Sequence, residues 1–282
     1  MSLSESLASF TAETRLQPEH RRLMDAHHRV VEWDASTAAE VPEALRPALA
    51  ELWRSRMVAE HRSIGIFSLY TLDLLGAGAP AEVVSLACRA SLDEVRHTEL
   101  FTRLTELYSG QREAPPGGIP PMPDDPSVPI RFQVAREALH LCVCSESFST
   151  ASLSELHARS SDPAVKGALA NVIADEIHHA RMGWVLLSRM LAEPDSGELR
   201  ARLQAELIPM FDGFARDLFG DPKEIPEPSL KGEDRRIAEA HGYIPLRDEY
   251  EIFRSVAEEV WVPGLAGLGL SSGDLRGRYP KL

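Results

Sequence analysis

The stretch Asp175-Glu176-Ile177-His178-His179 decides the fold prediction, because Asp93-Glu94-Val95-Arg96-His97 repeats its pattern. In both stretches an Asp precedes a Glu, and a His follows that Glu three residues later. Residues three apart on an α-helix lie on the same face, about one turn apart, so each Glu and its His point the same way. One such pair is typical of a solvated helix surface. Two copies raise the question of whether the two stretches meet at one site.

The composition of the chain around these stretches favours an all-α protein. Of 282 residues, 44% are hydrophobic, which is enough for a substantial core. Helix formers such as Ala, Leu, Glu and Arg dominate, and alternating β-branched stretches are scarce. The formal net charge of -13 makes a nucleic-acid or anionic-membrane partner unfavourable.

Cysteine usage and the termini indicate the compartment. Cys88, Cys142 and Cys144 are too few for a disulfide framework and form no C-x-x-C, which argues against a zinc ribbon or a rubredoxin-type iron site. The stretch 1–10 has no basic start followed by an apolar run, so no signal peptide is expected. The uncharged run 260–273 is too short to span a bilayer. We therefore expect a cytoplasmic protein.

Apolar spacing and helix-stop residues predict the elements in chain order. Long helices are expected at 42–76, 81–108, 130–160 and 163–191, with Asp162 as N-cap and Pro163 in the first turn of the last. Amphipathic helices follow at 197–219 and 246–260, and the tail from Gly264 is expected to be irregular. The connections are short, long and short, and the long one is the Pro-rich stretch 115–129. Two helical hairpins joined by a long crossover between the second and third helices form a ferritin-type bundle.

The register of the two hairpins brings four carboxylates to one depth. Glu60 and Glu94 lie nearly the same number of residues from the first turn, and Glu146 and Glu176 from the second. Four carboxylates and two imidazoles are the ligands that a pair of iron or manganese ions requires, whereas without metal the buried carboxylates would repel. The alternative is a metal-free bundle with buried salt bridges. Glu137 and Glu155 lie nine residues either side of Glu146 on an α-helix and are rejected as ligands.

The chain resembles the ferritin-like di-iron carboxylate superfamily, whose pattern is Glu, Glu-x-x-His, Glu, Glu-x-x-His on four helices. The resemblance covers residues 43–192, which gives an N-terminal extension at 1–42 and a C-terminal helical extension at 193–282 packed on the bundle. It implies the metal ligands Glu60, Glu94, His97, Glu146, Glu176 and His179. It also implies that Asp93 and Asp175 each accept a ring N–H from the ligating histidine of the other hairpin.

Side chains near these positions have two readings each. Thr150, one turn after Glu146, resembles the oxygen-activating threonine of bacterial multicomponent monooxygenases and is the candidate catalytic residue. The alternative is a helical Thr bonded to its own i−4 carbonyl. Ile64, Phe67 and Phe101 either line an apolar pocket near the metals or belong to the core, and Cys142 is read as a small core residue. His178 and His61 are expected to lie outside the site.

The resemblance implies a non-haem di-iron oxidase or oxygenase that activates O₂ and oxidises a small organic substrate with electrons from an external donor. Two Fe ions are expected, with Mn as an alternative at one or both sites. A ferroxidase or iron-storage protein shares the six ligands and is the second reading, and a partner-binding bundle with structural metals is the third. The extensions beyond the bundle favour the enzyme because extra helices shape a substrate pocket or a homodimer surface. The same extra helices would be difficult to accommodate in the closed cage of an iron-storage protein.

Overall fold

The computed structural model describes residues 16–25, 29–117 and 127–282, and every regular element within these ranges is a helix. This confirms the all-α prediction. The chain divides into two compact units, Met1–Val31 and Glu32–Leu282, and the first contains the helix α2 (Leu16–Asp25). The predicted absence of a signal peptide and part of the predicted crossover fall on residues outside the described ranges. The predicted division of the chain at residues 42 and 192 stays a prediction.

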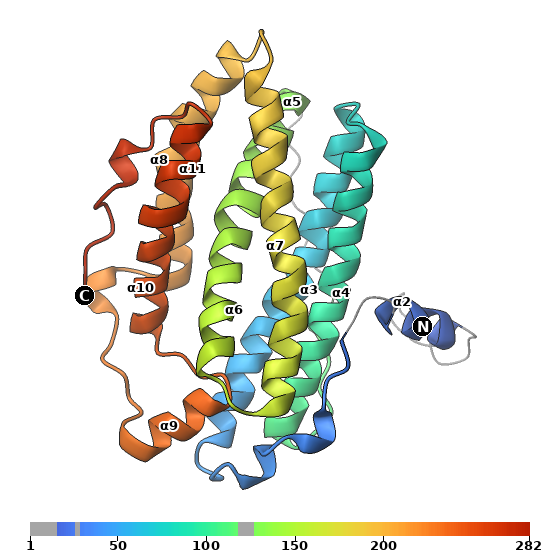
Figure 1. Cartoon of the computed structure of the whole chain (residues 1–282), viewed down its shortest axis with the longest axis vertical. Coiled ribbons are helices and arrows are strands. Elements are labelled where there is room, and N and C mark those ends of the chain that lie inside the picture. The colour runs from blue at the N-terminus through green and yellow to red at the C-terminus, as the bar shows by residue number, and fades with distance from the viewer. Residues whose placement is uncertain (1–15, 26–28, 118–126) are drawn as a thin grey trace. The chain divides into compact units, whose positions relative to one another are not determined.

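Four long helical segments run side by side through the second unit (Figure 1). The pair α3 (Arg46–Gly76) and α4 (Ala81–Ser109) forms the first hairpin. The second hairpin pairs α7 (Pro163–Ala192) with a continuous run of α5 (Ile130–Glu137), η3 (Ala138–Glu146) and α6 (Ser147–Arg159). The two hairpins contact each other through α4 and α7 and through α3 and α5. Within the described residues, no helix is both long and apolar enough to cross a membrane.

Helix ends follow the expected local chemistry, with one correction. The Asp162 side chain accepts a hydrogen bond from the Val165 amide at 3.0 Å, which confirms the predicted N-cap, and Gly110 ends α4 in the left-handed conformation at φ 70°. The first long helix begins at Arg46, so the predicted start at Pro42 was wrong. The Arg46 guanidinium bonds the carbonyls of Ala38, Ala39 and Val41, which holds the preceding chain in turns.

The third helical segment departs from the single helix predicted for 130–160. The middle stretch η3 is π-helical, with hydrogen bonds that span five residues rather than four. It lies where α7 comes closest, because a Cβ at Gly183 would sit only 2.3 Å from the Cys142 Cβ. The buried indole N–H of Trp261 donates to the Val143 carbonyl of this stretch at 3.0 Å. The irregular winding is therefore supported from both sides.

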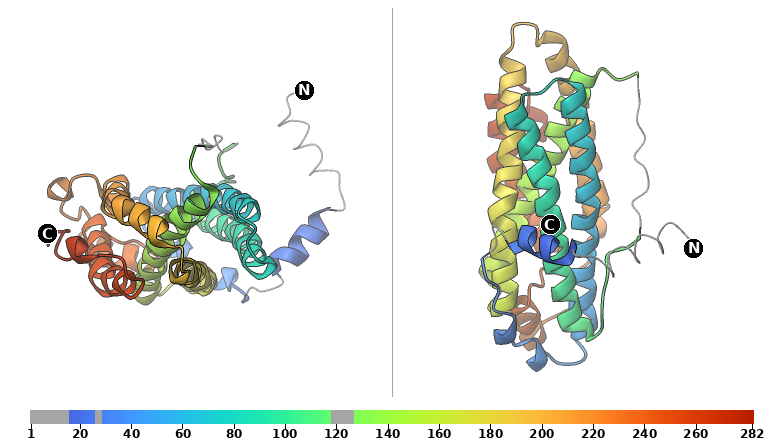
Figure 2. Two further views of the ribbon diagram at one scale, coloured as in Figure 1. Left: turned by 90° about the horizontal axis from the view of Figure 1, so that it is seen from above. Right: turned by 90° about the vertical axis from the view of Figure 1, so that its right-hand side faces the viewer.

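Helices of the C-terminal third cover the outer side of α6 and η3 (Figure 2). The amphipathic helix predicted for 197–219 is confirmed as α8 (Gly197–Phe219). The next predicted helix is α10 (Leu246–Val256), and it continues through η5 (Ala257–Trp261) into α11 (Val262–Gly267), so the helical run extends three residues past Gly264. A short polar helix, α9 (Gly232–Ala240), was not predicted.

The described residues also form short 3₁₀ turns. Two of them, η1 (Trp33–Ala35) and η2 (Ala38–Glu40), precede α3. The turn η4 (Pro222–Glu224) follows α8, and η6 (Gly273–Leu275) follows α11. Aromatic rings join α8 and α10 to the central segments. The Phe253 ring lies 5.5 Å from that of Phe148 and 5.4 Å from that of Phe219, centroid to centroid. These edge-on contacts bury large apolar surface and fix the C-terminal helices against α6.

Candidate metal centre

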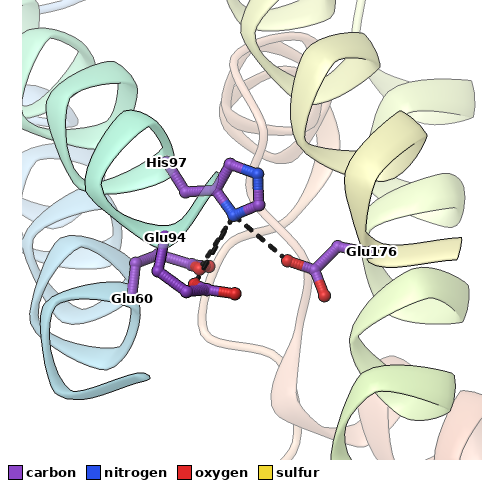
Figure 3. Close-up of side chains that lie close together, drawn as sticks. All are labelled: Glu60, Glu94, His97 and Glu176. Carbon is purple, nitrogen blue, oxygen red and sulfur yellow. Dashed lines mark ion pairs between the residues drawn. The ribbon is translucent and has the colours of Figure 1, made fainter. Parts of the chain in front are cut away.

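The four central segments bring all six predicted ligand residues to one place. Each hairpin contributes one lone Glu and one Glu-x-x-His, and the six residues are Glu60 on α3, Glu94 and His97 on α4, Glu146 at the end of η3, and Glu176 and His179 on α7. Figure 3 shows four of these side chains converging from both hairpins. All six are buried except Glu60, whose side chain is 12% exposed. The cluster is thus almost completely shielded from water.

The ligand atoms form two overlapping groups, each suited to one metal ion. Within a group, the donor atoms lie within 4.8 Å of one another, and the groups are Glu60, Glu94, His97, Glu176 and Glu94, Glu146, Glu176, His179. Glu94 and Glu176 belong to both. Each group therefore has one histidine, one carboxylate of its own and two shared carboxylates.

The two oxygens of each shared carboxylate face different histidines. Glu94 Oε2 lies 3.5 Å from His97 Nδ1, while its Oε1 lies 3.3 Å from His179 Nδ1. Glu176 repeats this with Oε1 at 3.2 Å from His97 Nδ1 and Oε2 at 3.9 Å from His179 Nδ1. Two ligand atoms that each lie about 2.1 Å from one ion are about 3–4 Å apart, so these gaps are the size of a metal ion.

All of these atoms except Glu176 Oε1 lack hydrogen-bond partners. Among the described residues, both carboxylate oxygens of Glu94, Oε2 of Glu176 and Nδ1 of both histidines are buried and unpaired. Buried polar atoms are nearly always satisfied, and leaving one unsatisfied costs about 1–3 kcal/mol. Five such atoms facing one another indicate a missing partner that accepts lone pairs, which is what a metal cation does.

Burial and mutual charge shift the acid–base behaviour of the cluster. Burial raises the pKa of Glu60 and of Glu146 well above the usual range, and the charges of Glu94 and Glu176 respectively raise them further. Burial also opposes ionisation of Glu94 and His97, but their attraction overcomes it, so the pKa of Glu94 is lowered and that of His97 raised. Without a cation, protons on Glu60, Glu146 and His97 therefore offset part of the negative charge of the cluster.

Each histidine points its second ring nitrogen at an aspartate from the other hairpin. His97 Nε2 lies 3.4 Å from Asp175 Oδ2, and His179 Nε2 lies 3.2 Å from Asp93 Oδ2. An N–H on Nε2 that donates to the aspartate leaves the Nδ1 lone pair directed into the cluster. Asp93 and Asp175 thus lie where they can fix the tautomer that a metal ligand needs.

Two arginines beside these aspartates were missed in the sequence. The Arg89 guanidinium lies 3.4 Å from Asp93 and 3.3 Å from Asp175, so it bridges both carboxylates. Arg96 is 1% exposed and contacts Asp93 from within the same helix. Both lie three or four residues from Asp93, and this spacing on a helix was the available signal.

The other side chains considered in the sequence analysis differ in their contacts and in their exposure to solvent. Thr150 is half-buried, and its hydroxyl donates to the Glu146 carbonyl at 2.8 Å, which is the backbone-bonded arrangement named as the alternative. Phe67 packs on the His179 ring at 5.1 Å, whereas Phe101 packs on Trp53 in the core. Ile64 is half-buried and Cys142 is buried, while His178 is exposed and His61 half-buried.

Glu137 and Glu155 lie apart from the cluster. Glu137 accepts a hydrogen bond from Gln133, and Glu155 pairs with Arg159 at 2.7 Å. Neither belongs to the two ligand groups found among the described residues.

The geometry therefore supports a buried Glu and His cluster that could hold metal ions. Comparison of the chain with models of known protein families, with curated proteins and with solved structures gives no match.

Proposed function

We propose that this chain is a ferritin-like di-iron carboxylate protein that activates O₂ to oxidise a small organic substrate. The observation that carries the proposal is the pair of four-residue ligand groups that share Glu94 and Glu176. A Glu from each of two helices plus a Glu-x-x-His from each of the other two is the ligand pattern of di-iron and di-manganese carboxylate bundles. Two Fe ions are proposed, and Mn suits the same oxygen-rich ligands.

The ferritin-like topology is part of this proposal. Two hairpins, α3 with α4 and the α5–η3–α6 run with α7, supply equivalent halves of the cluster, and the chain between Ser109 and Ile130 joins them. In a ferritin-like bundle the corresponding connection is one long crossover. Equivalent roles for Glu60 and Glu146, and for His97 and His179, support this arrangement.

The chain's own residues prepare the site for such chemistry. When bound, an iron pair supplies the electrons and the Lewis acidity for O₂ reduction. Glu94 and Glu176 hold the two positions together, and Asp93 and Asp175 keep the lone pairs of the histidine Nδ1 atoms aimed inward. The buried surroundings exclude water, so charges in the cluster act over a low dielectric. Thr150 is proposed to position a proton near Glu146, a role that requires its hydroxyl to leave the Glu146 carbonyl.

The reading as an oxidase or oxygenase rather than a ferroxidase or storage protein is supported by the extent of the helical cover. The helices α8 and α10 pack against the outer side of the second hairpin and bury a large aromatic cluster. Such cover suits a discrete enzyme that takes O₂, an organic substrate and electrons from an external donor. A homodimer is proposed as its assembly, and the cytoplasm as its location.

Aerobic addition of Fe(II) to the metal-free protein tests the proposal. The enzyme reading predicts saturation at about two irons per chain, the number that two four-residue groups require, together with rapid O₂ consumption. Glu176→Gln removes one shared ligand and should abolish both signals, whereas Glu82→Gln on the exposed start of α4 should leave them unchanged. Uptake of many irons per chain would establish storage instead, and the absence of any binding would overturn both readings.

A further inference from the structure

A second candidate binding site lies between α4 and α7, next to Asp93 and His179. A cavity of about 400 Å³ opens there, within the range of about 300–1,000 Å³ that is usual for small-molecule sites. Its apolar walls come from both helices and consist of Val83, Leu86, Met182, Val185 and Leu186. Leu86 is 50% exposed and Val185 47% exposed, so the cavity is reachable from solvent. An apolar ligand could bury these side chains.

The polar lining is mainly cationic. Arg89, Arg181 and Arg189 all border the cavity, and Arg89 alone is engaged by the aspartates behind it. Arg181 and Arg189 are exposed, and neither forms an ion pair with another residue in the described part of the chain. In a chain with a net charge of -13, an apolar cavity bordered by arginines is a local exception. A guanidinium fork matches a carboxylate in geometry and charge.

The inner end of the cavity is closed by Asp93 and His179. The His179 ring turns Nε2 toward Asp93, and its Nδ1 faces Glu94 on the opposite side. Of the six ligand residues, only His179 lines the cavity, and a molecule there meets the side of its ring that faces Asp93. The His179 ring therefore separates the cavity from the carboxylates of the cluster.

We propose that this cavity binds an amphiphilic monoanion, a carboxylate attached to an unbranched aliphatic chain. The carboxylate pairs with Arg189 at the Val83 end of the cavity, and the aliphatic chain lies along the apolar walls toward Arg181, about 12 Å further along α7. Between Val83 and Asp93, α4 rises about 15 Å, so a chain of moderate length fits along the cavity. Because the ligand does not need the metal, its binding is independent of the proposed oxidase activity.

Calorimetric titration of the full-length, metal-free protein with octanoate tests the proposal. Each added methylene that is buried strengthens binding about fourfold, so hexanoate, octanoate and decanoate should bind in rising order until the cavity is filled. Octanamide, with the same chain and no charge, should bind about tenfold more weakly because it loses the charge-assisted hydrogen bonds. Octyltrimethylammonium should not bind.

Variants locate the site. Arg181→Gln with Arg189→Gln should weaken octanoate binding about tenfold or more, while Arg276→Gln, an exposed arginine in the C-terminal tail, should leave it unchanged. Val185→Trp should block the cavity, and Leu86→Trp blocks it from the other helix if the first variant folds poorly. Thermal melts report the folding of each variant. The proposal is overturned if octanoate does not bind, or if it binds equally well to the charge-deleted and the blocked variants.

Discussion

At the scale of single residues, the two ring nitrogens of each histidine in the cluster face different partners. One ring nitrogen faces an aspartate of the opposite hairpin, and the other faces the shared glutamates. The aspartate settles which nitrogen carries the proton and makes the imidazole a better donor of its lone pair. The identity of a residue outside the ligand groups should therefore change metal affinity.

Asp175→Asn should weaken Fe(II) or Mn(II) binding about 10–100-fold while leaving the fold intact, because an amide oxygen still accepts from His97 but carries no charge. The matched control is Asp217→Asn, an exposed aspartate on α8. Metal affinity is measured by calorimetric titration. An unchanged affinity in Asp175→Asn would show that this carboxylate has no part in metal binding.

A separate prediction concerns Glu137 and the pH dependence of folding stability. Burial and the neighbouring Asp73 charge raise the pKa of Glu137 from 4.5 to about 7, and its Oε2 is buried without a hydrogen-bond partner among the described residues. A carboxyl whose pKa is raised by folding costs stability as the pH rises from its unfolded value to its folded value. Glu137 should therefore destabilise the protein progressively between pH 4.5 and 7.

Glu137→Gln should leave stability nearly unchanged at pH 4.5 and raise it by about 1–2 kcal/mol at pH 8, a figure reduced for solvent screening at this half-buried position. Denaturant unfolding at the two pH values measures the difference. Glu82→Gln on the exposed start of α4 should show no such pH dependence. Equal stability of wild type and Glu137→Gln at pH 8 would contradict the assignment.

At the scale of elements, the crossing of α7 over the π-helical η3 depends on one missing side chain. A Cβ at Gly183 would lie 2.3 Å from the Cys142 Cβ and 2.9 Å from the Ala138 carbonyl oxygen, neither of which can move without shifting a helix. Along the same helical segments, Glu146 lies about one turn from Cys142, and Glu176 about two turns from Gly183. Packing and ligand geometry are therefore linked at this point.

Gly183→Ala should lower the free energy of unfolding by about 1–3 kcal/mol because the added methyl forces the helices apart. Gly213→Ala in α8 is the matched control, since a Cβ there meets nothing within 4 Å. It should be neutral or stabilising by up to about 1 kcal/mol, the difference in helix propensity. Urea unfolding of both variants gives the comparison, and equal stabilities would show that the crossing tolerates a side chain.

At the scale of the whole molecule, residues from both hairpins form the cluster, so the proposed metal binding would be a property of the assembled second unit. Metal should therefore stabilise the folded chain as a whole. At 100 times its dissociation constant, Fe(II) or Mn(II) should add about 2.7 kcal/mol, or roughly 5–10 °C in Tm for a unit of this size. Calorimetry with and without chelator measures the shift. A shift that persists in Glu176→Gln would place the metal elsewhere.

Much of this molecule could be predicted from sequence, for identifiable reasons. Proline and glycine marked the ends of α4, α7 and α8. Nearly equal spacing from the turn of each hairpin predicted that Glu60, Glu94, Glu146 and Glu176 lie at one depth, and the structure brings them together. That these residues bind metal stays a prediction. The π-helical winding of η3 could not be predicted because it depends on contacts with Gly183 and Trp261, which are distant in sequence.

Tertiary contacts also explain the unpredicted helix α9. Its sequence is polar, with no continuous apolar face, and it is held at its end instead. The Ala240 carbonyl accepts from the amides of Ser161 and Asp162, and the next residue, His241, bonds the Tyr108 hydroxyl at 2.8 Å. Local propensity carries no information about such distant partners.

The sharing of Glu94 and Glu176 between the two ligand groups has a consequence for the order of folding. Each hairpin is built from contacts close in sequence and can form early, but neither group is complete until a glutamate of the other hairpin arrives. Tight metal binding is therefore expected only once the hairpins have docked. Metal should slow unfolding and leave the refolding rate nearly unchanged. The folded state would therefore live longer, but it would not form faster.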